Sequence, residues 1–303
     1  MKNKLISFSI QNIKPFAQNK TFDVDIDKIN FYTITGEIGS GKSNIIKSLE
    51  LFQFLLVNSY KLFSFVSSEK YAVYLDKPIN FKLIFKIKDK IYRYEFSIIK
   101  NIIIKESLII SDNNKPIEIV FNRTKKNITV KGYKASNFKL VKPTELLMSY
   151  LAYNKNENFL EIYNFLTKEI IIKRDIKDCE EYLLSEYSSY FNQQISSLKS
   201  LYELFKKEKN IFNDLKKEYN LFFNKNINFK DKKSSSYKAF ILLFLIKYSQ
   251  LTGKTIILDN LDNYLNYSFL IKLINLENFQ LIGVCNTIEN FYSNKIKKYI
   301  IFT

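Results

Sequence analysis

Hydrophobic and polar side chains alternate along residues 79–130, and short polar segments interrupt the alternation. Successive side chains of a β-strand point to opposite faces, so this period of two predicts strands with one buried face. Shorter runs of the same kind predict strands within residues 4–34. We therefore expect an antiparallel β-lobe over residues 79–140. Its hairpin turns are predicted at residues 88–90, 113–116 and 123–127.

The pattern changes to helical spacing in the second half of the chain. A helix is predicted to begin at residues 143–145, after the break at Pro143. Between residues 180 and 224 apolar side chains recur every three, four or seven positions and lysines fill the other faces, which predicts a helical lobe. The end of the chain alternates helix with strand, as in a largely parallel sheet with helices against it. The helices are expected at 240–248 and 267–276, and the strands at 255–258, 280–284 and 299–302.

Residues 36–43 read Gly-Glu-Ile-Gly-Ser-Gly-Lys-Ser and fit the pattern G-x-x-x-x-G-K-[ST]. An apolar run precedes them at 29–34 and a helix-like run follows at 44–57, which is the context that a phosphate-binding loop needs. Glycines let backbone amides close around a phosphate at a helix N-terminus, Lys42 reaches the β- and γ-oxygens, and the Ser43 hydroxyl is left for Mg²⁺. The whole chain has only six glycines. Because Gly36, Gly39 and Gly41 all fall in this loop, we predict a nucleotide site.

A phosphate loop needs a carboxylate at the end of another strand to hold Mg²⁺ and its water. Residues 256–259, Ile-Ile-Leu-Asp, supply one. Any buried strand that meets a turn looks similar, so this pattern is weak alone and gains its weight from the loop upstream. Asp259 is therefore predicted as the carboxylate on the magnesium side.

The composition of the chain bears on the kind of partner and on the kinds of site that it can form. The formal charge of +17 favours an acidic partner such as nucleic acid, but nearly all the cations are lysines in a chain rich in Asn, Ile, Phe and Tyr. That profile is typical of an A+T-biased coding sequence, which weakens the inference of an acidic partner.

The absence of histidine excludes a Cys/His zinc site and an imidazole base, and Cys179 and Cys285 are expected to be buried, reduced residues. The longest apolar run, 239–246, is too short to span a bilayer, so we expect a cytoplasmic protein without a membrane partner.

With these motifs the chain resembles the ABC-type ATPase heads of the SMC and recombination-repair class. It is most similar to the bacterial AAA ATP-binding proteins related to the overcoming-lysogenization-defect ATPases. The resemblance covers most of the chain. It rests on the opening strand and turn at 5–16, the phosphate loop at 36–51, the β-lobe around 92–94 and 106–108, a signature-like segment at 234–238, a Walker B and D-loop run at 259–265, and the switch strand at 280–286.

The departures from that family affect the groups that promote hydrolysis. Asn260 stands where the family has the glutamate that polarises the attacking water, and an amide cannot accept that proton. Asn286 stands in place of the switch histidine. Ser236 stands where the family's signature segment usually has glycine. The bulkier serine would hinder the close approach of the backbone to the γ-phosphate bound by a second head, although Ser234 can still donate a hydrogen bond.

The resemblance implies an α/β P-loop NTPase fold, an ABC-type head with an antiparallel β-lobe and a helical lobe inserted. A single head would span residues 1–303, with ATP and Mg²⁺ as its cofactors. Its parts would be 1–78 with the phosphate loop, 79–140 as the β insertion, 141–232 as the helical lobe and 233–303 as the signature and Walker B lobe. Ser43 and Asp259 would be the metal ligands. The nucleotide-binding residues would be Gly36, Glu37, Ile38, Gly39, Ser40, Gly41, Lys42, Ser43, Asn44, Ser234 and Ser236, with Lys42, Asp259, Asn260 and Asn286 at the reacting phosphate.

Because the binding groups are kept and the hydrolytic groups are changed, the sequence predicts a head that binds ATP with slow or absent hydrolysis and dimerises through an ATP sandwich. Its partner would be a second copy or a related chain. The implied setting is DNA repair or phage defence. Another carboxylate, Asp262 or Glu37, is the alternative to a missing general base. Two alternative functions also stay open: an active ATP hydrolase acting on nucleic acid, and a catalytically silent subunit that dimerises with an active paralogue or holds an effector protein in check. The lysine-rich residues 206–233 are either a surface for nucleic-acid phosphates or a solvated helix face.

Overall fold

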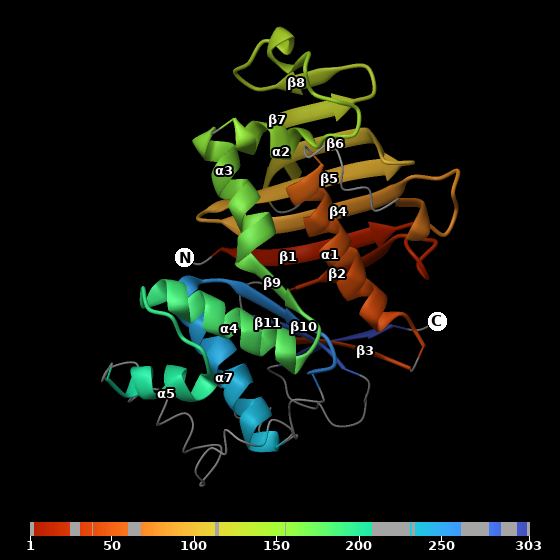
Figure 1. Ribbon diagram of the computed structural model, residues 1–303. Coiled ribbons are helices and arrows are strands. Elements are labelled where there is room, and N and C mark those ends of the chain that lie inside the picture. The colour runs from red at the N-terminus through yellow and green to blue at the C-terminus, as the bar shows by residue number, and fades with distance from the viewer. Residues whose placement is uncertain are drawn as a thin grey trace. The chain divides into compact units, whose positions relative to one another are not determined.

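The computed structural model describes residues 3–24, 31–37, 39–59, 68–112, 115–154, 156–207, 231, 234–261, 279–285 and 296–301. The chain divides into two compact units, each built on its own sheet (Figure 1). The first unit combines residues 1–28 with residues 43–170. The second combines residues 29–42 with residues 171–303.

The first unit contains a seven-stranded sheet in which every neighbouring pair is antiparallel. The strand order is β2-β1-β4-β5-β6-β7-β8. The burial of β4 alternates strictly along the strand, as expected where one face packs on a core and the other meets solvent. The strands are β1 (Lys4–Gln11), β2 (Lys20–Asp23), β4 (Ile79–Ile87), β5 (Lys90–Ile99), β6 (Ile102–Asp112), β7 (Lys115–Thr124) and β8 (Ile128–Val130).

Helix α1 (Lys42–Asn58) packs on the inner face of this sheet (Figure 1). The ring of Phe52 lies 5.8 Å from that of Phe81 and 5.6 Å from that of Phe96, which is the range of favourable aromatic contacts. Farther along the same face, Phe121 contacts Phe159. The shorter helical segments of this unit are η1 (Ser68–Lys70), η2 (Ala135–Phe138), α2 (Leu147–Tyr153), α3 (Glu157–Asn164) and the π-helical turn η3 (Phe165–Glu169).

The second unit contains a five-stranded sheet in the order β12-β3-β11-β10-β9. The pairs β12 with β3, β3 with β11 and β11 with β10 are all parallel. The carboxyl ends of these four strands therefore meet at one edge, which is where ligands bind in open α/β sheets. The strands are β3 (Phe31–Gly36), β9 (Ile170–Lys173), β10 (Thr255–Leu258), β11 (Gln280–Val284) and β12 (Ile296–Ile301).

In the described part of the second unit, the helices that pack with this sheet are α4 (Ile176–Tyr190), α5 (Leu198–Lys207) and α7 (Ser235–Thr252). Every residue of α7 from 239 to 246 is buried, which explains why its sequence lacks a polar face. Helix α7 ends at Thr252, and the next residue, Gly253, caps it with a left-handed backbone (φ 79°). Its aromatic side chains pack against those of α4 and α5, as where Phe244 contacts Tyr187 and Phe205.

The predicted fold class is confirmed: an α/β P-loop NTPase fold with an antiparallel β-lobe and added helices. The hairpins of the β-lobe and the strands at 255–258 and 280–284 lie where the sequence pattern predicts them. The helix predicted to begin at residues 143–145 begins instead at Leu147. The strand β9 was not predicted. The predicted helix at 267–276 and most of residues 206–233 lie outside the described residues.

Candidate nucleotide-binding site

The predicted phosphate loop leaves the carboxyl end of β3 and enters α1. Gly39 and Gly41 both have a φ of 90°, a backbone conformation open to glycine but strained for other residues. The Ser40 amide donates to the Glu37 carbonyl at 3.2 Å, which closes a tight turn between them. Alternating backbone conformations of this kind turn successive amides toward one concave side, the arrangement that binds anions. The two glycines are thus required by the curvature of the loop.

Lys42 lies inside the curve of the loop. Its side chain is 5% exposed, and its ammonium donates to the carbonyls of Gly36 at 2.7 Å and Glu37 at 2.6 Å. An ammonium group has three N–H donors, so one donor remains beyond these two contacts. Lys42 therefore stabilises the loop from within and keeps a positive charge at the place where phosphate oxygens would bind.

The fit of the loop to a phosphate group is tested by Ser40. Its residue exposure is 2%, and its Oγ is buried without a hydrogen-bond partner in the structure. Buried hydroxyl groups are nearly always paired, because an unpaired one costs about 1–3 kcal/mol. A phosphate oxygen held by the loop would supply the missing partner. The residues present consequently fit a nucleotide phosphate.

Asp259 follows the last residue of β10, at the same sheet edge as the loop. Leu258 pairs with Gly283 of β11, and Gly283 pairs with Thr33 of β3, so β11 separates the Asp259 strand from the loop strand by two strand spacings, roughly 10 Å. Asp259 is 5% exposed, and its amide donates to the Lys173 carbonyl of β9 at 3.0 Å. The register thus places a buried carboxylate at the same sheet edge as the phosphate loop, two strands away from it.

Asn260 adopts a left-handed backbone (φ 51°), and its amide donates to the Asp259 carboxylate at 3.0 Å. Asparagine tolerates this conformation better than glutamate does, because its short polar side chain compensates the steric cost. The next residue, Leu261, packs over Gly283, where a Cβ atom would lie 2.2 Å from the Leu261 Cδ2. Gly283 therefore allows the turn after Asp259 to lie flat on β11, and that turn favours asparagine at position 260.

Ser234 caps helix α7. Its hydroxyl oxygen accepts from the Tyr237 amide at 3.2 Å, donates to the Asp231 carbonyl at 2.8 Å and contacts the Ser236 hydroxyl at 3.1 Å. Serine is a preferred N-cap residue because it satisfies an amide that the helix leaves unpaired. The two predicted signature serines are thus neighbours at a helix N-terminus, and capping already engages the Ser234 hydroxyl.

The second unit holds most of the predicted site. It contains the loop from Gly36 to Lys42, the turn at Asp259 and Asn260, and the cap at Ser234 and Ser236. Ser43 and Asn44 belong to the first unit, where the Ser48 hydroxyl donates to the Asn44 carbonyl. Ile38 and Asn286 lie outside the described residues. The strand that leads to Asn286 is confirmed, and the Cys285 amide after it donates to the Ile34 carbonyl of β3 at 2.9 Å.

Two contributors to the site were missed by reasoning from sequence. The strand β9, which accepts the Asp259 amide, could have been found from the β-branched run Ile170-Ile171-Ile172 after a helical segment. Gly283 could have been found because an isolated glycine inside a strand pattern often marks a close approach. Only the strand register shows that the group packed on Gly283 is Leu261.

Comparisons with known proteins give little further information. No family model matches the chain, and no curated protein matches it. Solved structures do match. The SMC head domain from Thermotoga maritima aligns over 94% of this chain and 89% of its own, with 12% sequence identity and a TM-score of 0.41.

The fold and the loop define the class of this protein: it is an α/β protein with a P-loop NTPase fold. None of the helices in the described part of the chain combines the length and apolar character that crossing a bilayer requires. Function has to be inferred from the chain's own residues, since 12% identity to a solved structure concerns the fold alone.

Proposed function

We propose that this chain is an ABC-type head that binds Mg-ATP and holds it with slow or absent hydrolysis. The observation that carries the proposal is the contrast between two parts of one sheet edge. Lys42 is buried against the phosphate loop, whereas Asn260, which follows Asp259, has a left-handed backbone and an amide side chain that cannot act as a general base. A nucleotide is then bound by the same groups as in an active enzyme, but its hydrolysis lacks a proton acceptor at position 260.

Mg²⁺ in this proposal is bound together with the nucleotide. Among the described residues no three His, Cys, Asp or Glu side chains come together as a metal site. Magnesium ions at phosphate loops are usually held by one or two protein oxygens, phosphate oxygens and water, so such a cluster is not needed. Ser43 and Asp259 are the proposed protein ligands. The ion would neutralise charge on the phosphates and position a water.

The first prediction concerns position 260. Replacing Asn260 with glutamate should raise ATP turnover at least tenfold, because a positioned general base contributes on the order of 10²–10⁴ in rate. The left-handed backbone should cost the variant about 1 kcal/mol in stability. The measurement is steady-state phosphate release beside a thermal melt. Asn260→Ala is the control and should hydrolyse no faster than the wild type. Brisk wild-type turnover that Asn260→Ala abolishes would contradict the proposal and favour an active hydrolase.

We further propose that ATP drives dimerisation, with the loop of one head and the Ser234 cap of another on either side of the nucleotide. Helix N-termini attract anionic groups, which supports a phosphate at this cap. The partner is a second copy or a related chain, and DNA repair or phage defence in the cytoplasm is the setting that the family resemblance suggests. A ligand shifts such an equilibrium only as far as it binds the dimer better than the monomer.

The second prediction follows from this switch. Size-exclusion chromatography with light scattering should show a monomer without nucleotide and a dimer with Mg-ATP. Mg-ADP serves as the control, and it should leave the protein monomeric because it lacks the γ-phosphate. If the molecular mass stays the same in all three conditions although ATP binds, ATP does not drive dimerisation. That result would favour the alternative of a catalytically silent interaction subunit.

A further inference from the structure

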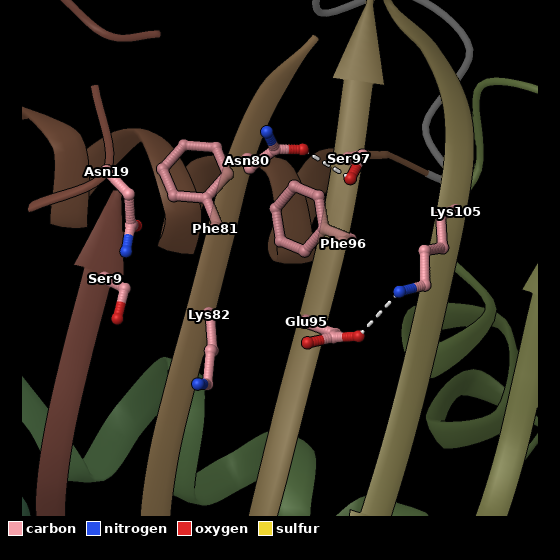
Figure 2. Close-up of a pocket in the computed structure, with 9 residues that line it drawn as sticks. All are labelled: Ser9, Asn19, Asn80, Phe81, Lys82, Glu95, Phe96, Ser97 and Lys105. Carbon is pink, nitrogen blue, oxygen red and sulfur yellow. Dashed lines mark hydrogen bonds and ion pairs between the residues drawn. The ribbon is translucent and has the colours of Figure 1, made fainter. Parts of the chain in front are cut away.

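A polar groove of the first unit crosses β1, β4, β5 and β6, and several of its side chains pair with one another across the strands (Figure 2). Lys105 donates to the Glu95 carboxylate at 2.9 Å, and the Ser97 hydroxyl donates to the Asn80 side-chain carbonyl at 2.6 Å. These contacts join neighbouring strands and single out no ligand. Side chains that bear on the proposed nucleotide site lie in the second unit instead.

Helix α4 forms one side of a largely half-buried cluster of charged and aromatic side chains, all of which belong to the second unit. Lys173 is the last residue of β9, Lys254 directly precedes β10, and Tyr248 lies in the last turns of α7. Tyr182 and Glu186 lie on α4 itself. We refer to these residues as the α4 clamp, because they bring both strands and both helices to one place.

The Lys254 ammonium is the centre of the α4 clamp. It donates to the Glu186 carboxylate at 3.0 Å and to the Tyr248 hydroxyl at 3.1 Å. Its third contact is the Tyr182 hydroxyl at 3.4 Å. An ammonium group has three N–H donors, so these oxygens use all of them. The residue that leads into β10 is therefore fixed to α4 and α7.

Lys173 reaches the same helix from β9. Its ammonium lies 4.7 Å from the centroid of the Tyr182 ring, which is the range of a favourable cation–π contact. Only Arg174 and Asp175 separate β9 from α4, and the Asp175 carboxylate caps the helix by accepting from the Asp178 amide at 2.9 Å. The Lys173 side chain thus folds back over a short, capped turn and fixes the direction in which β9 meets α4.

One carboxylate of the α4 clamp interacts with two lysines. Burial acts to raise the pKa of the Glu186 carboxyl, but the hydrogen bonds from Tyr248 and Lys254 and the charges of Lys254 and Lys173 outweigh it and lower that pKa overall. Glu186 is therefore ionised at neutral pH. Lys254 forms the direct ion pair with it, whereas Lys173 is held by the Tyr182 ring and by a longer-range attraction to Glu186. Tyr182 is consequently the side chain that contacts both lysines.

The two strands that the α4 clamp fixes are the strands that position Asp259. Asp259 directly follows β10, and its amide donates to the Lys173 carbonyl of β9 at 3.0 Å. A displacement of β9 from β10 would move this acceptor and the Asp259 backbone with it. Residues that orient a metal ligand affect metal affinity strongly, because a bound ion tolerates only small displacements of its ligands.

We propose that Tyr182 is a positioning residue of the nucleotide site: by holding Lys173 and Lys254 to α4, it fixes β9 against β10 and places Asp259 for Mg²⁺. This inference rests on the proposed function, in which Asp259 is a ligand of the Mg²⁺ that is bound with ATP. Tyr182 acts through the two strands and makes no contact with the nucleotide itself. Its loss should therefore weaken the contribution of Mg²⁺ to binding and leave the contribution of the phosphate loop unchanged.

The third prediction concerns the factor by which saturating Mg²⁺ strengthens the binding of a fluorescent ATP analogue to the full chain, relative to binding in excess EDTA. Tyr182→Leu removes the ring and should reduce this factor about threefold to tenfold. Tyr182→Phe keeps the ring and should stay within about twofold of the wild type. In EDTA both variants should bind the analogue like the wild type, a result that general loss of structure would not give.

Tyr190→Leu is the matched control, because Tyr190 lies at the end of the same helix, outside the α4 clamp, and is 52% exposed. It should change the factor by less than about twofold. Lys173→Met provides a second test if Tyr182→Leu does not fold. It removes the charge over the ring but keeps a long side chain, and it should also reduce the factor about threefold to tenfold. An unchanged factor in Lys173→Met would overturn the positioning role.

Asp259→Asn distinguishes failure of this inference from failure of the proposed function. Because Tyr182 acts through the Asp259 carboxylate, Asp259→Asn combined with Tyr182→Leu should reduce the factor no further than Asp259→Asn alone. If Asp259→Asn leaves the factor unchanged, Asp259 is not a metal ligand, and the proposed magnesium site fails together with this inference. If Asp259→Asn reduces the factor but Tyr182→Leu does not, or if the two reductions multiply in full, Tyr182 does not position Asp259 and the proposed function stands.

Discussion

Replacing Lys42 with alanine is expected to weaken ATP binding roughly a hundredfold or more, since truncating one partner of a buried, hydrogen-bonded charge pair commonly costs 2–5 kcal/mol. The ammonium has two roles in the structure. It supplies the positive charge of the loop, and it holds the carbonyls of Gly36 and Glu37 together. Its removal both deletes a phosphate contact and loosens the backbone that makes the others. The measurement is titration with a fluorescent ATP analogue.

Lys47→Ala is the matched control for this prediction. Lys47 lies in the same helix and is exposed, so the substitution removes the same charge without touching the loop. Its affinity for ATP should stay within about twofold of the wild type. If Lys42→Ala also stays within about threefold while remaining folded, the loop is not the nucleotide site and the proposed function fails with it.

Replacing Glu106 with alanine should destabilise the protein by about 3–5 kcal/mol, which is the expected cost of breaking a buried ion pair from one side. Glu106 is fully buried in β6. Its carboxylate accepts from the amides of Leu147 at 2.6 Å and Met148 at 2.9 Å, accepts from the Tyr94 hydroxyl at 2.9 Å, and lies 3.6 Å from the Arg123 guanidinium. Alanine would leave these donors and one buried charge without their acceptor.

Urea denaturation of the Glu106→Ala variant, followed by circular dichroism, measures this loss. Glu161→Ala is the control, because Glu161 forms an exposed ion pair with Lys88 and its removal should leave the midpoint nearly unchanged. The double variant Glu106→Leu with Arg123→Met should regain only the part of the loss that comes from the unpaired charge, because the amides of Leu147 and Met148 would still lack an acceptor. A loss below about 1 kcal/mol for Glu106→Ala would show that the network does not hold α2 to the sheet.

The same network explains where the sequence failed to place a helix. Pro143 suggested a helix start at residues 143–145, but the Arg123 guanidinium takes the carbonyls of Lys142 and Glu145, which holds that segment outside the helix. Glu106 then accepts the first amides of α2 at Leu147 and Met148. A carboxylate and a guanidinium from the strands set the helix start, and no local pattern contains that information.

Structural elements that depend only on neighbouring residues were predicted well from the sequence. The period of two along 79–98 gives β4 and β5, since alternation needs no knowledge of distant segments. The loop from Gly36 to Lys42 was likewise predictable, because its conformation depends on its own glycines. Contacts across strands were not. The fit of Leu261 against Gly283 depends on the register of β10 and β11.

The chemical identity of the bound nucleotide tests most directly whether the protein holds ATP without hydrolysing it. The purified protein would be mixed with Mg-ATP, separated from free nucleotide by rapid gel filtration and incubated, and the bound nucleotide would then be released by acid and identified by chromatography. We expect ATP in close to one copy per head, with little ADP. Bound ADP, formed within minutes and lost when Asn260 is replaced by alanine, would contradict the account.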